Sequence, residues 1–247
     1  MAFAPPVENH GRVRVTPLFI TVALAWVVGQ ILAVPAVSVA ATLAGFHGKL
    51  SHLLAASTHA PWWVVTAALT AIWIGFLGGV VVAQRWARVP RWRGAWRFRL
   101  GDIKFVFLGV ACQIAVGLAY LPFHSPTRNQ PTQHLFGASH GAAFVLVAVL
   151  SVIGAPLVEE MFFRGALFGG LASVAPTRTN LVMAVAVSSA LFGAAHVEWF
   201  QFPGLAAMGA VLAIVAWRTK RLAPAFITHA AFNAVALLGV IAQRMHH

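Results

Sequence analysis

Hydrophobic residues in this chain fall into long runs without charge, separated by short polar or basic segments. Seven such runs occupy residues 18–46, 61–83, 105–122, 141–158, 181–195, 205–217 and 222–242. A helix needs about 20 apolar residues to cross a bilayer core of about 30 Å. The pattern therefore predicts an all-α fold, a polytopic membrane helical bundle of about seven spans. The run at 205–217 is short enough to form only a half-span.

The composition supports the same fold class. The chain is 60% hydrophobic and 9% charged, with a mean hydropathy of +0.82, whereas soluble domains carry about 25% charged residues. Seven spans in 247 residues leave no room for a soluble catalytic domain. We expect a single integrated membrane domain, with N-terminal spans in residues 1–140 and a second, more polar set of spans in residues 141–242.

Basic charge is concentrated beside the hydrophobic runs. The formal net charge is +12, and seven Lys and Arg residues lie between Arg85 and Lys104. This placement is typical of cytoplasmic loops that meet anionic lipid, rather than of nucleic-acid binding, so no nucleic-acid partner is expected. Trp86, Trp92 and Trp96 lie among the arginines, which predicts an interfacial helix on the cytoplasmic face. The N-terminus is then cytoplasmic, and residues 218–221 form a second cytoplasmic turn.

The first hydrophobic run follows Arg12 and Arg14, as a signal peptide would. It is much longer than the roughly 7–15 apolar residues of a cleaved signal, so we expect an uncleaved first span. The chain has one cysteine, Cys112, which rules out an internal disulfide and a cysteine-rich zinc site. We expect Cys112 to be a small core residue. Gly75-xxx-Gly79 and Gly165-xxx-Gly169 have the spacing of closely packed membrane helices.

Two adjacent carboxylates interrupt an apolar stretch. The chain has only five acidic residues, and two of them are Glu159 and Glu160, followed by Arg164. In a helix Glu160 and Arg164 share a face and can pair, whereas Glu159 points about 100° away. A carboxylate without a balancing charge in an apolar setting is a candidate general base. A purely structural ion pair is the alternative.

Two further polar sites interrupt later runs. His196 ends the fifth run, and His229 and Asn233 lie four residues apart in the seventh. Ionisable groups within membrane spans are rare and commonly functional. Taken singly, His196 could be an interfacial residue, and His229 with Asn233 could make a hydrogen bond between helices. All three sites together indicate one shared chemistry.

These motifs resemble those of the CPBP family, the CAAX proteases and bacteriocin-processing proteins, over residues 141–239. The motifs that carry the resemblance are Glu159-Glu160-xxx-Arg164, Phe192-xxx-His196 and His229-xxx-Asn233. The resemblance implies an all-helical intramembrane endopeptidase that cleaves a membrane-anchored protein or peptide. It also implies that Glu159 and His196 activate a water molecule, while His229 and Asn233 stabilise the oxyanion as preorganised donors.

Metal dependence is left open by the sequence. Zinc held by Glu159, His196 and His229 is an alternative to the metal-free mechanism that we prefer, which requires no cofactor. No His-Glu-xxx-His motif occurs, and no serine or cysteine belongs to the set, which disfavours an acyl-enzyme. Two other functions remain as alternatives, a proton-coupled membrane transporter and a non-catalytic bacteriocin-immunity protein. The composition, rich in Ala, Val and Arg, suits the plasma membrane of a bacterium.

The predicted topology raises one difficulty. It places Glu159 near the cytoplasmic end of the fourth span and His196 near the outer end of the fifth, although the mechanism requires them to meet. Either the fourth helix continues through Arg164 to about Leu171, or the fifth span is tilted or broken.

Overall fold

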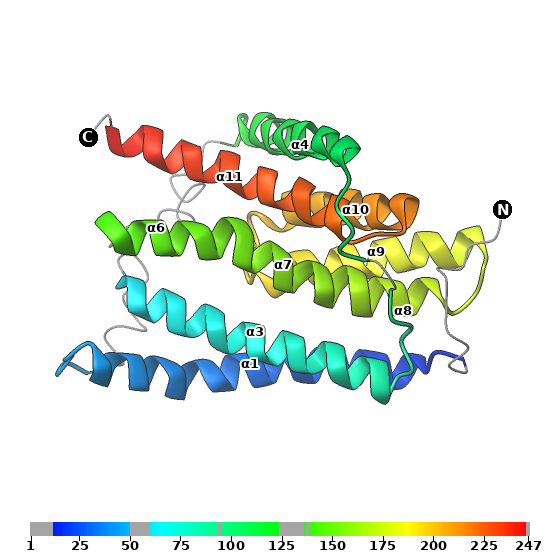
Figure 1. Cartoon of the computed structure of the whole chain (residues 1–247), viewed down its shortest axis with the longest axis horizontal. Helices are drawn as coiled ribbons and strands as arrows, with labels where there is room; N and C mark the ends of the chain where they lie inside the picture. The colour runs from blue at the N-terminus through cyan, green and yellow to red at the C-terminus, as the bar shows by residue number, and fades with distance from the viewer. Residues whose placement is uncertain (1–11, 50–59, 93–94, 124–135, 137–138, 246–247) are drawn as a thin grey trace.

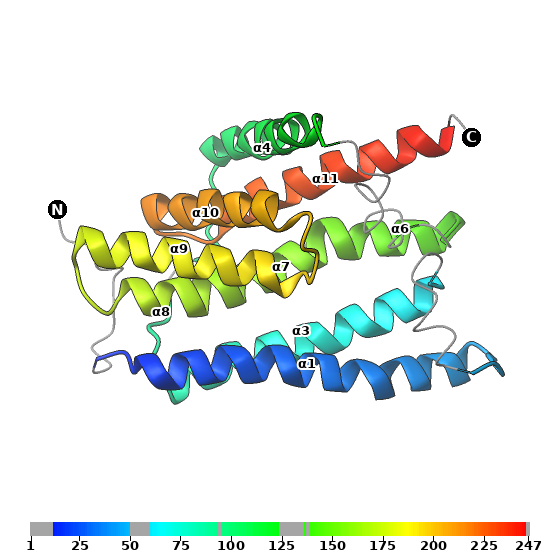
Figure 2. The same cartoon turned by 180° about the vertical axis from the view of Figure 1, so that it is seen from behind.

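The computed structural model describes residues 12–49, 60–92, 95–123, 136 and 139–245. Its helices run back and forth along one axis (Figures 1 and 2). In the described residues, seven helices are long and apolar enough to cross a membrane, which confirms the all-α polytopic bundle. They are α1 (Val15–Leu43), α3 (Trp62–Arg85), η1 with α4 (Leu100–Ile103 and Lys104–Tyr120), one long helix from Gly141 to Ala172, α9 (Arg178–Ala195), α10 (Phe202–Thr219) and α11 (Ala223–Met245).

The sixth of these helices, α10, shows whether the short hydrophobic run at residues 205–217 forms a full span or a half-span. The structure extends the short hydrophobic run at both ends, to the 18 residues of α10. This length gives roughly 27 Å of helix, close to the thickness of a bilayer core. Pro203 stands in the first turn, where its missing amide hydrogen costs nothing. The helix is therefore long enough to cross.

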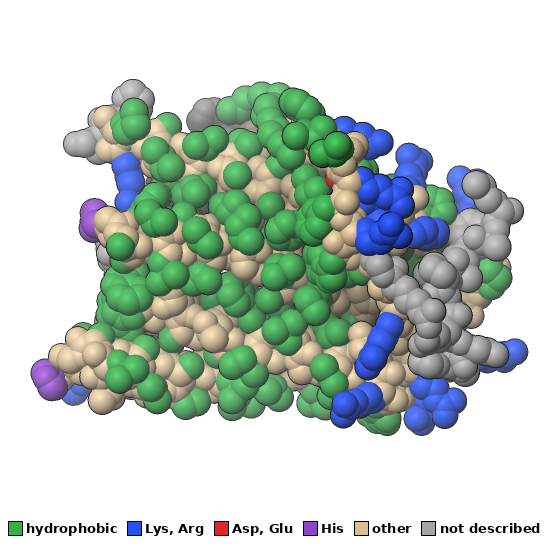
Figure 3. All heavy atoms as spheres, in the orientation of Figure 1, with side chains coloured by type: hydrophobic (Ala, Val, Ile, Leu, Met, Phe, Trp, Pro, Cys, Tyr) green, Lys and Arg blue, Asp and Glu red, His purple; other side chains and the backbone are tan. Residues whose placement is uncertain are grey.

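The outer surface of the bundle is apolar along most of its length. Large hydrophobic side chains project outward, among them Ile31, Leu43 and Phe107, which are 63%, 84% and 70% exposed. Figure 3 shows this belt of hydrophobic side chains, with Lys and Arg gathered at one end of the bundle. Such a surface suits contact with lipid, since its side chains are apolar and the helices hydrogen-bond their own backbone groups.

Small residues set the closest helix contacts. In α3, a β-carbon at Gly75 would lie 2.8 Å from the backbone nitrogen of Gly29 in α1, and one at Gly79 would lie 2.6 Å from the Ala25 side chain. The predicted packing role of this glycine pair is thus confirmed. On the other side of the bundle, a methyl group at Gly109 of α4 would collide with the Thr228 carbonyl of α11.

The long helix combines α-helical and π-helical turns. It consists of α6 (Gly141–Val149), η2 (Leu150–Gly154), α7 (Ala155–Glu159), η3 (Glu160–Phe168) and α8 (Gly169–Ala172), of which η2 and η3 are π-helical. Pro156 lacks an amide hydrogen, and the π turn η2 ends at Gly154, two residues before it. The fourth helix therefore continues through Arg164, which was the first of the two predicted ways for Glu159 and His196 to meet.

Aromatic packing holds η3 inside the bundle. Phe76 of α3 stacks on Phe162 with ring centroids 4.3 Å apart. Phe163 meets Phe76 and, on its other side, Phe192 of α9, each edge to face. These rings form part of the main buried cluster, so η3 is enclosed by α3 and α9.

The predicted interfacial helix in the basic segment is wrong. Residues 86–92 and 95–99 form turns and extended chain, and helix begins only at Leu100. Pro90 disfavours helix at and before its position, and Arg88 adopts a left-handed φ of 58°. Trp92 and Trp96 pack against the buried clusters of the bundle instead of lying at its surface. Cys112 is partly buried against the same cluster as Trp96, as a small packing residue.

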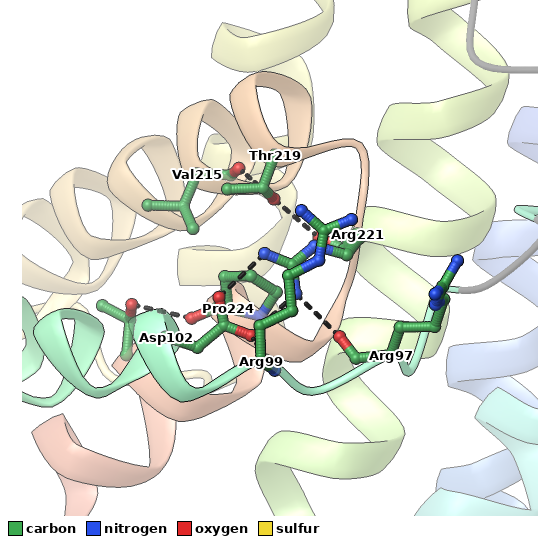
Figure 4. A network of polar contacts seen from close by, with 8 residues as sticks. Arg97, Arg99, Asp102, Val215, Thr219, Arg221 and Pro224 are labelled. Carbon is green, nitrogen blue, oxygen red and sulfur yellow. Dashed lines mark hydrogen bonds and ion pairs between the residues drawn. The ribbon is translucent and has the colours of Figure 1, made fainter.

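An ion pair clamps the basic segment to the turn between α10 and α11 (Figure 4). Arg221 donates to both carboxylate oxygens of Asp102, at 2.7 and 2.8 Å, and to the carbonyl of Arg97 at 2.7 Å. Asp102 in turn accepts from the backbone N–H of Arg99. Asp102 holds the pKa of the Arg221 guanidinium above its usual value. The clamp fixes the start of α4 beside the start of α11.

Replacing Arg221 tests this clamp. Arg221→Ala leaves Asp102 without its bidentate partner and should lower the free energy of unfolding by about 1–3 kcal/mol, as for hydrogen bonds to charged groups. Arg221→Lys keeps the charge but not the forked geometry, so its free energy of unfolding should lie between those of the wild type and Arg221→Ala. The measurement is thermal unfolding in detergent. A wild-type melting temperature for Arg221→Ala would show that the clamp does not support the fold.

Candidate active site

A buried ion pair lies at the middle of the bundle. Arg164 and Glu160, both on η3, are 1% and 0% exposed, and their side chains meet at 3.1 Å between Nη1 and Oε1. Arg164 also donates to the carbonyl of Gly209 on α10 at 3.2 Å. The pairing predicted from the sequence is present, although the segment is π-helical rather than α-helical.

An aromatic ring completes the environment of Arg164. The guanidinium carbon lies 4.2 Å from the ring centroid of Phe192, which is a cation–π contact. The same ring lies 5.0 Å from the His196 ring and 5.6 Å from the His229 ring. Phe192 therefore contacts both histidine rings as well as the buried guanidinium.

His229 connects the ion pair to Glu159. Its Nδ1 lies 2.9 Å from Oε1 of Glu160, and because a carboxylate accepts, we assign the proton to Nδ1. Its Nε2 lies 3.8 Å from Oε2 of Glu159. The distance is too long for a hydrogen bond. One water molecule at hydrogen-bond distance from both atoms fits this separation.

Glu159 and Glu160 each have a buried Oε2 without a hydrogen-bond partner among the described residues, but of the two it is Glu159 that lines a cavity. Its side chain is 15% exposed, and the cavity has a volume of about 530 Å³. Buried polar atoms are almost always paired with protein or water. The cavity also exposes the other polar side chains of the motif, which are His196, His229 and Asn233.

His196 reaches the cavity because of the helix arrangement. The long helix ends at Ala172, and α9 returns beside it to end at Ala195, so His196 caps α9 at the depth of the cavity. Its Nδ1 donates to the carbonyl of Phe192 at 2.8 Å. This assignment leaves Nε2 as an acceptor. The continued fourth helix, not a broken fifth span, therefore brings Glu159 and His196 to one cavity.

Asn233 is tied to the long helix. Its amide nitrogen donates to the carbonyl of Ser151, in the π turn η2, at 3.0 Å. An asparagine amide has two hydrogens, so one remains for another acceptor. The contact fixes the side chain at the cavity wall.

The donor set does not match a zinc site. Among the residues that the structure describes, no three His, Cys, Asp or Glu side chains lie together in a way that could hold a metal ion. Glu159, His196 and His229 thus share a cavity but not a ligand geometry, and we derive no step through a metal. The hydrogen bond from Nδ1 of His229 to Glu160 does not bear on this choice, because metal-bound histidines commonly make the same bond with their other ring nitrogen.

Several residues of the site are not apparent from sequence patterns. Tyr120, the single tyrosine of the chain, donates to the carbonyl of Phe200 at 2.9 Å and accepts from the N–H of Gly204 at 3.1 Å. It joins the end of α4 to the start of α10 at the cavity wall. Gln113 of α4 also lines the cavity, and its buried Oε1 has no partner in the described part of the chain. A polar residue within an apolar span was the available signal for both.

Comparison with known proteins finds similarity over part of the chain. Residues 141–235 match the family described as type II CAAX prenyl endopeptidase Rce1-like. A protein of Bacillus subtilis (strain 168) named "Putative membrane peptidase YdiL" is 29% identical over 120 residues, covering 49% of this chain. The alignment covers 47% of that protein, so the chain spans about half of its length. No solved structure shows significant similarity to the chain.

Fold and site together define a multi-pass helical membrane protein with a carboxylate–histidine cluster at the bottom of a cavity. Over residues 141–235 the chain is similar to the CPBP family, through its match to the type II CAAX prenyl endopeptidase Rce1-like description. The resemblance that the three sequence motifs indicate is thereby confirmed.

A double-mutant cycle tests the buried pair. Glu160→Ala and Arg164→Ala should each cost about 3–5 kcal/mol of stability, because each leaves the other charge buried without its partner. The double variant should lose less than the sum of the two. Melting temperatures in detergent measure all three. Strictly additive losses would show that the two side chains do not interact.

Proposed function

We propose that this protein is an endopeptidase of the bacterial plasma membrane that hydrolyses a peptide bond in a membrane-associated protein or peptide. The matched family is named for an endopeptidase and the Bacillus subtilis relative for a membrane peptidase, which favours proteolysis over transport or immunity without catalysis. Anionic lipid is the proposed partner of the basic segment around residues 85–104.

The position of Glu159, with its unpaired Oε2 at the cavity, carries the proposal. Arg164 balances the charge of Glu160, so this glutamate forms a structural ion pair. Glu159 has no arginine of its own and faces His229 across 3.8 Å at the cavity. A carboxylate in this position can hold a water molecule and accept its proton.

The proposed reaction uses Glu159 as general base and then as general acid. Glu159 accepts a proton from water while the water oxygen attacks the carbonyl carbon, and Nε2 of His196 serves as a second acceptor that orients the water. The tetrahedral intermediate collapses as the C–N bond breaks. The leaving amine takes the proton from Glu159, and the products are a carboxylic acid and an amine.

The oxyanion requires donors, and two are proposed. If both glutamates are ionised and Arg164 is charged, a protonated His229 makes the cluster neutral. Its Nδ1–H then remains on Glu160 and its Nε2–H is available to the oxyanion. The second amide hydrogen of Asn233 is the other donor. One donor of this kind is typically worth about 3–4 kcal/mol in the transition state.

Glu159→Gln is the decisive variant. It keeps size and hydrogen-bonding capacity but removes the base, so cleavage should fall by about 10²-fold or more. The assay is peptidase activity of the purified protein on a quenched-fluorescent peptide mixture in detergent micelles. The melting temperature should stay near wild type, in contrast to Glu160→Ala. Full activity at normal expression would remove Glu159 from the mechanism.

Metal analysis decides between the metal-free mechanism and zinc. We expect purified wild-type protein to remain active after chelation, without stoichiometric zinc. His229→Ala should lower turnover with little change in KM, because an oxyanion donor acts mainly in the transition state. Stoichiometric zinc in the wild type that disappears in His229→Ala would contradict this mechanism.

A further inference from the structure

The two ends of the bundle differ strongly in charge. At one end lie the start of α1, the end of α3, the start of α4, the α8–α9 turn and the α10–α11 turn (Figure 1). We call this the basic end, since it carries twelve of the Lys and Arg residues that the structure describes. They are Arg12, Arg14, Arg85, Arg88, Arg91, Arg97, Arg99, Lys104, Arg178, Arg218, Lys220 and Arg221.

The opposite end is poor in positive charge. Of the described Lys and Arg residues it carries Lys49, after α1, and Arg244, near the end of α11. Arg244 is engaged by the protein itself, because it donates to the Ser139 carbonyl at 3.1 Å and lies over the Phe144 ring. The asymmetry is visible in Figure 3, where the blue side chains crowd one end. Positive charge of this kind marks the cytoplasmic side of a membrane protein.

The cavity extends toward the opposite end. Its lining runs from Glu159 and His229 in the centre of the bundle to Tyr120 at the end of α4, to Phe136 before α6 and to Gln243 near the end of α11. The turn between α9 and α10 also contributes to the lining. All of these helix ends lie away from the basic end, in both views of the fold (Figures 1 and 2).

Toward the basic end, buried side chains lie next to the site, and a separate cavity of about 420 Å³ lies beyond them, lined by Trp92, Arg97, Met161 and other residues but not by Glu159 or His229. The next turns of the long helix toward the basic end place Phe163 and Leu167 in the core, 2% and 0% exposed. On α10, Leu212 and Ala216 are both 0% exposed, and so is Ala225 at the start of α11. These close-packed side chains belong to neither cavity lining and lie on the basic side of Glu159 and His229.

We infer that the catalytic cavity opens to the extracytoplasmic face of the membrane, and that its substrate is a peptide segment presented from that side. The second half of this statement rests on the proposed peptidase function, whereas the direction of the opening does not. Substrates would then be secreted, surface-anchored or membrane proteins cut at an extracytoplasmic segment.

The lining suits a peptide backbone. Gln113 presents a buried carbonyl oxygen without a described partner, and an amide can pair with an extended peptide. Among the described residues, the lining contains Glu198 at the α9–α10 turn but no Lys or Arg. The cavity therefore favours neutral or basic peptide segments over acidic ones.

Cysteine labelling in intact cells tests the direction of the opening. In a Cys112→Ala background, Ala236→Cys places a thiol on the cavity wall of α11. Leu238→Cys places one two residues later on the same helix, where Leu238 is 61% exposed on the apolar surface. Arg218→Cys marks the basic end. The probe is a membrane-impermeant maleimide, applied before and after permeabilisation.

Ala236→Cys should react in intact cells, Arg218→Cys only after permeabilisation, and Leu238→Cys under neither condition because lipid covers it. Reaction of Arg218→Cys in intact cells, or of Ala236→Cys only after permeabilisation, would overturn the inference. Gln201→Cys at the α9–α10 turn gives the same readout if Ala236→Cys fails to fold. Labelling of Ala236→Cys should be unchanged by Glu159→Gln, so the result does not depend on whether the protein is a peptidase.

Discussion

The burial of Arg164 is the constraint around which the core is arranged. A guanidinium that is 1% exposed in a membrane bundle needs partners for its charge and its N–H groups. Glu160 balances the charge, the Gly209 carbonyl of α10 accepts a hydrogen bond, and the Phe192 ring of α9 covers one face. Glu160 in turn accepts a hydrogen bond from His229 on α11. Four helices are thus held in register by one cation.

The same arrangement leaves Glu159 chemically distinct from its neighbour. One arginine cannot balance two carboxylates, and Arg164 is committed to Glu160. Glu159 therefore faces the cavity with an unsatisfied oxygen and with His229 as its nearest ionisable partner. The structural role of Glu160 is the physical reason why we propose Glu159 as the base.

The N-terminal spans take part in the site although the family match begins at residue 141. α4 supplies Gln113 and Tyr120 to the cavity wall, and the Asp102–Arg221 clamp holds its start beside α11. α3 packs its aromatic side chains against η3. The helices that carry the candidate site are therefore enclosed by spans outside the matched segment.

Sequence patterns by themselves determined the fold class, the spans, the Glu160–Arg164 pair and the set of polar residues at the site. These follow from local hydrophobicity and helical spacing, which need no knowledge of neighbouring helices. They failed for the basic segment, where the inward packing of Trp92 and the Asp102–Arg221 clamp outweigh the surface preference of a basic, aromatic stretch. Only the tertiary structure decided which groups meet: that His229 contacts Glu160, that the fourth helix runs on to bring Glu159 level with His196, and that the cavity leads away from the basic end. Such contacts join residues far apart in the chain, and helical spacing says nothing about how separate helices align.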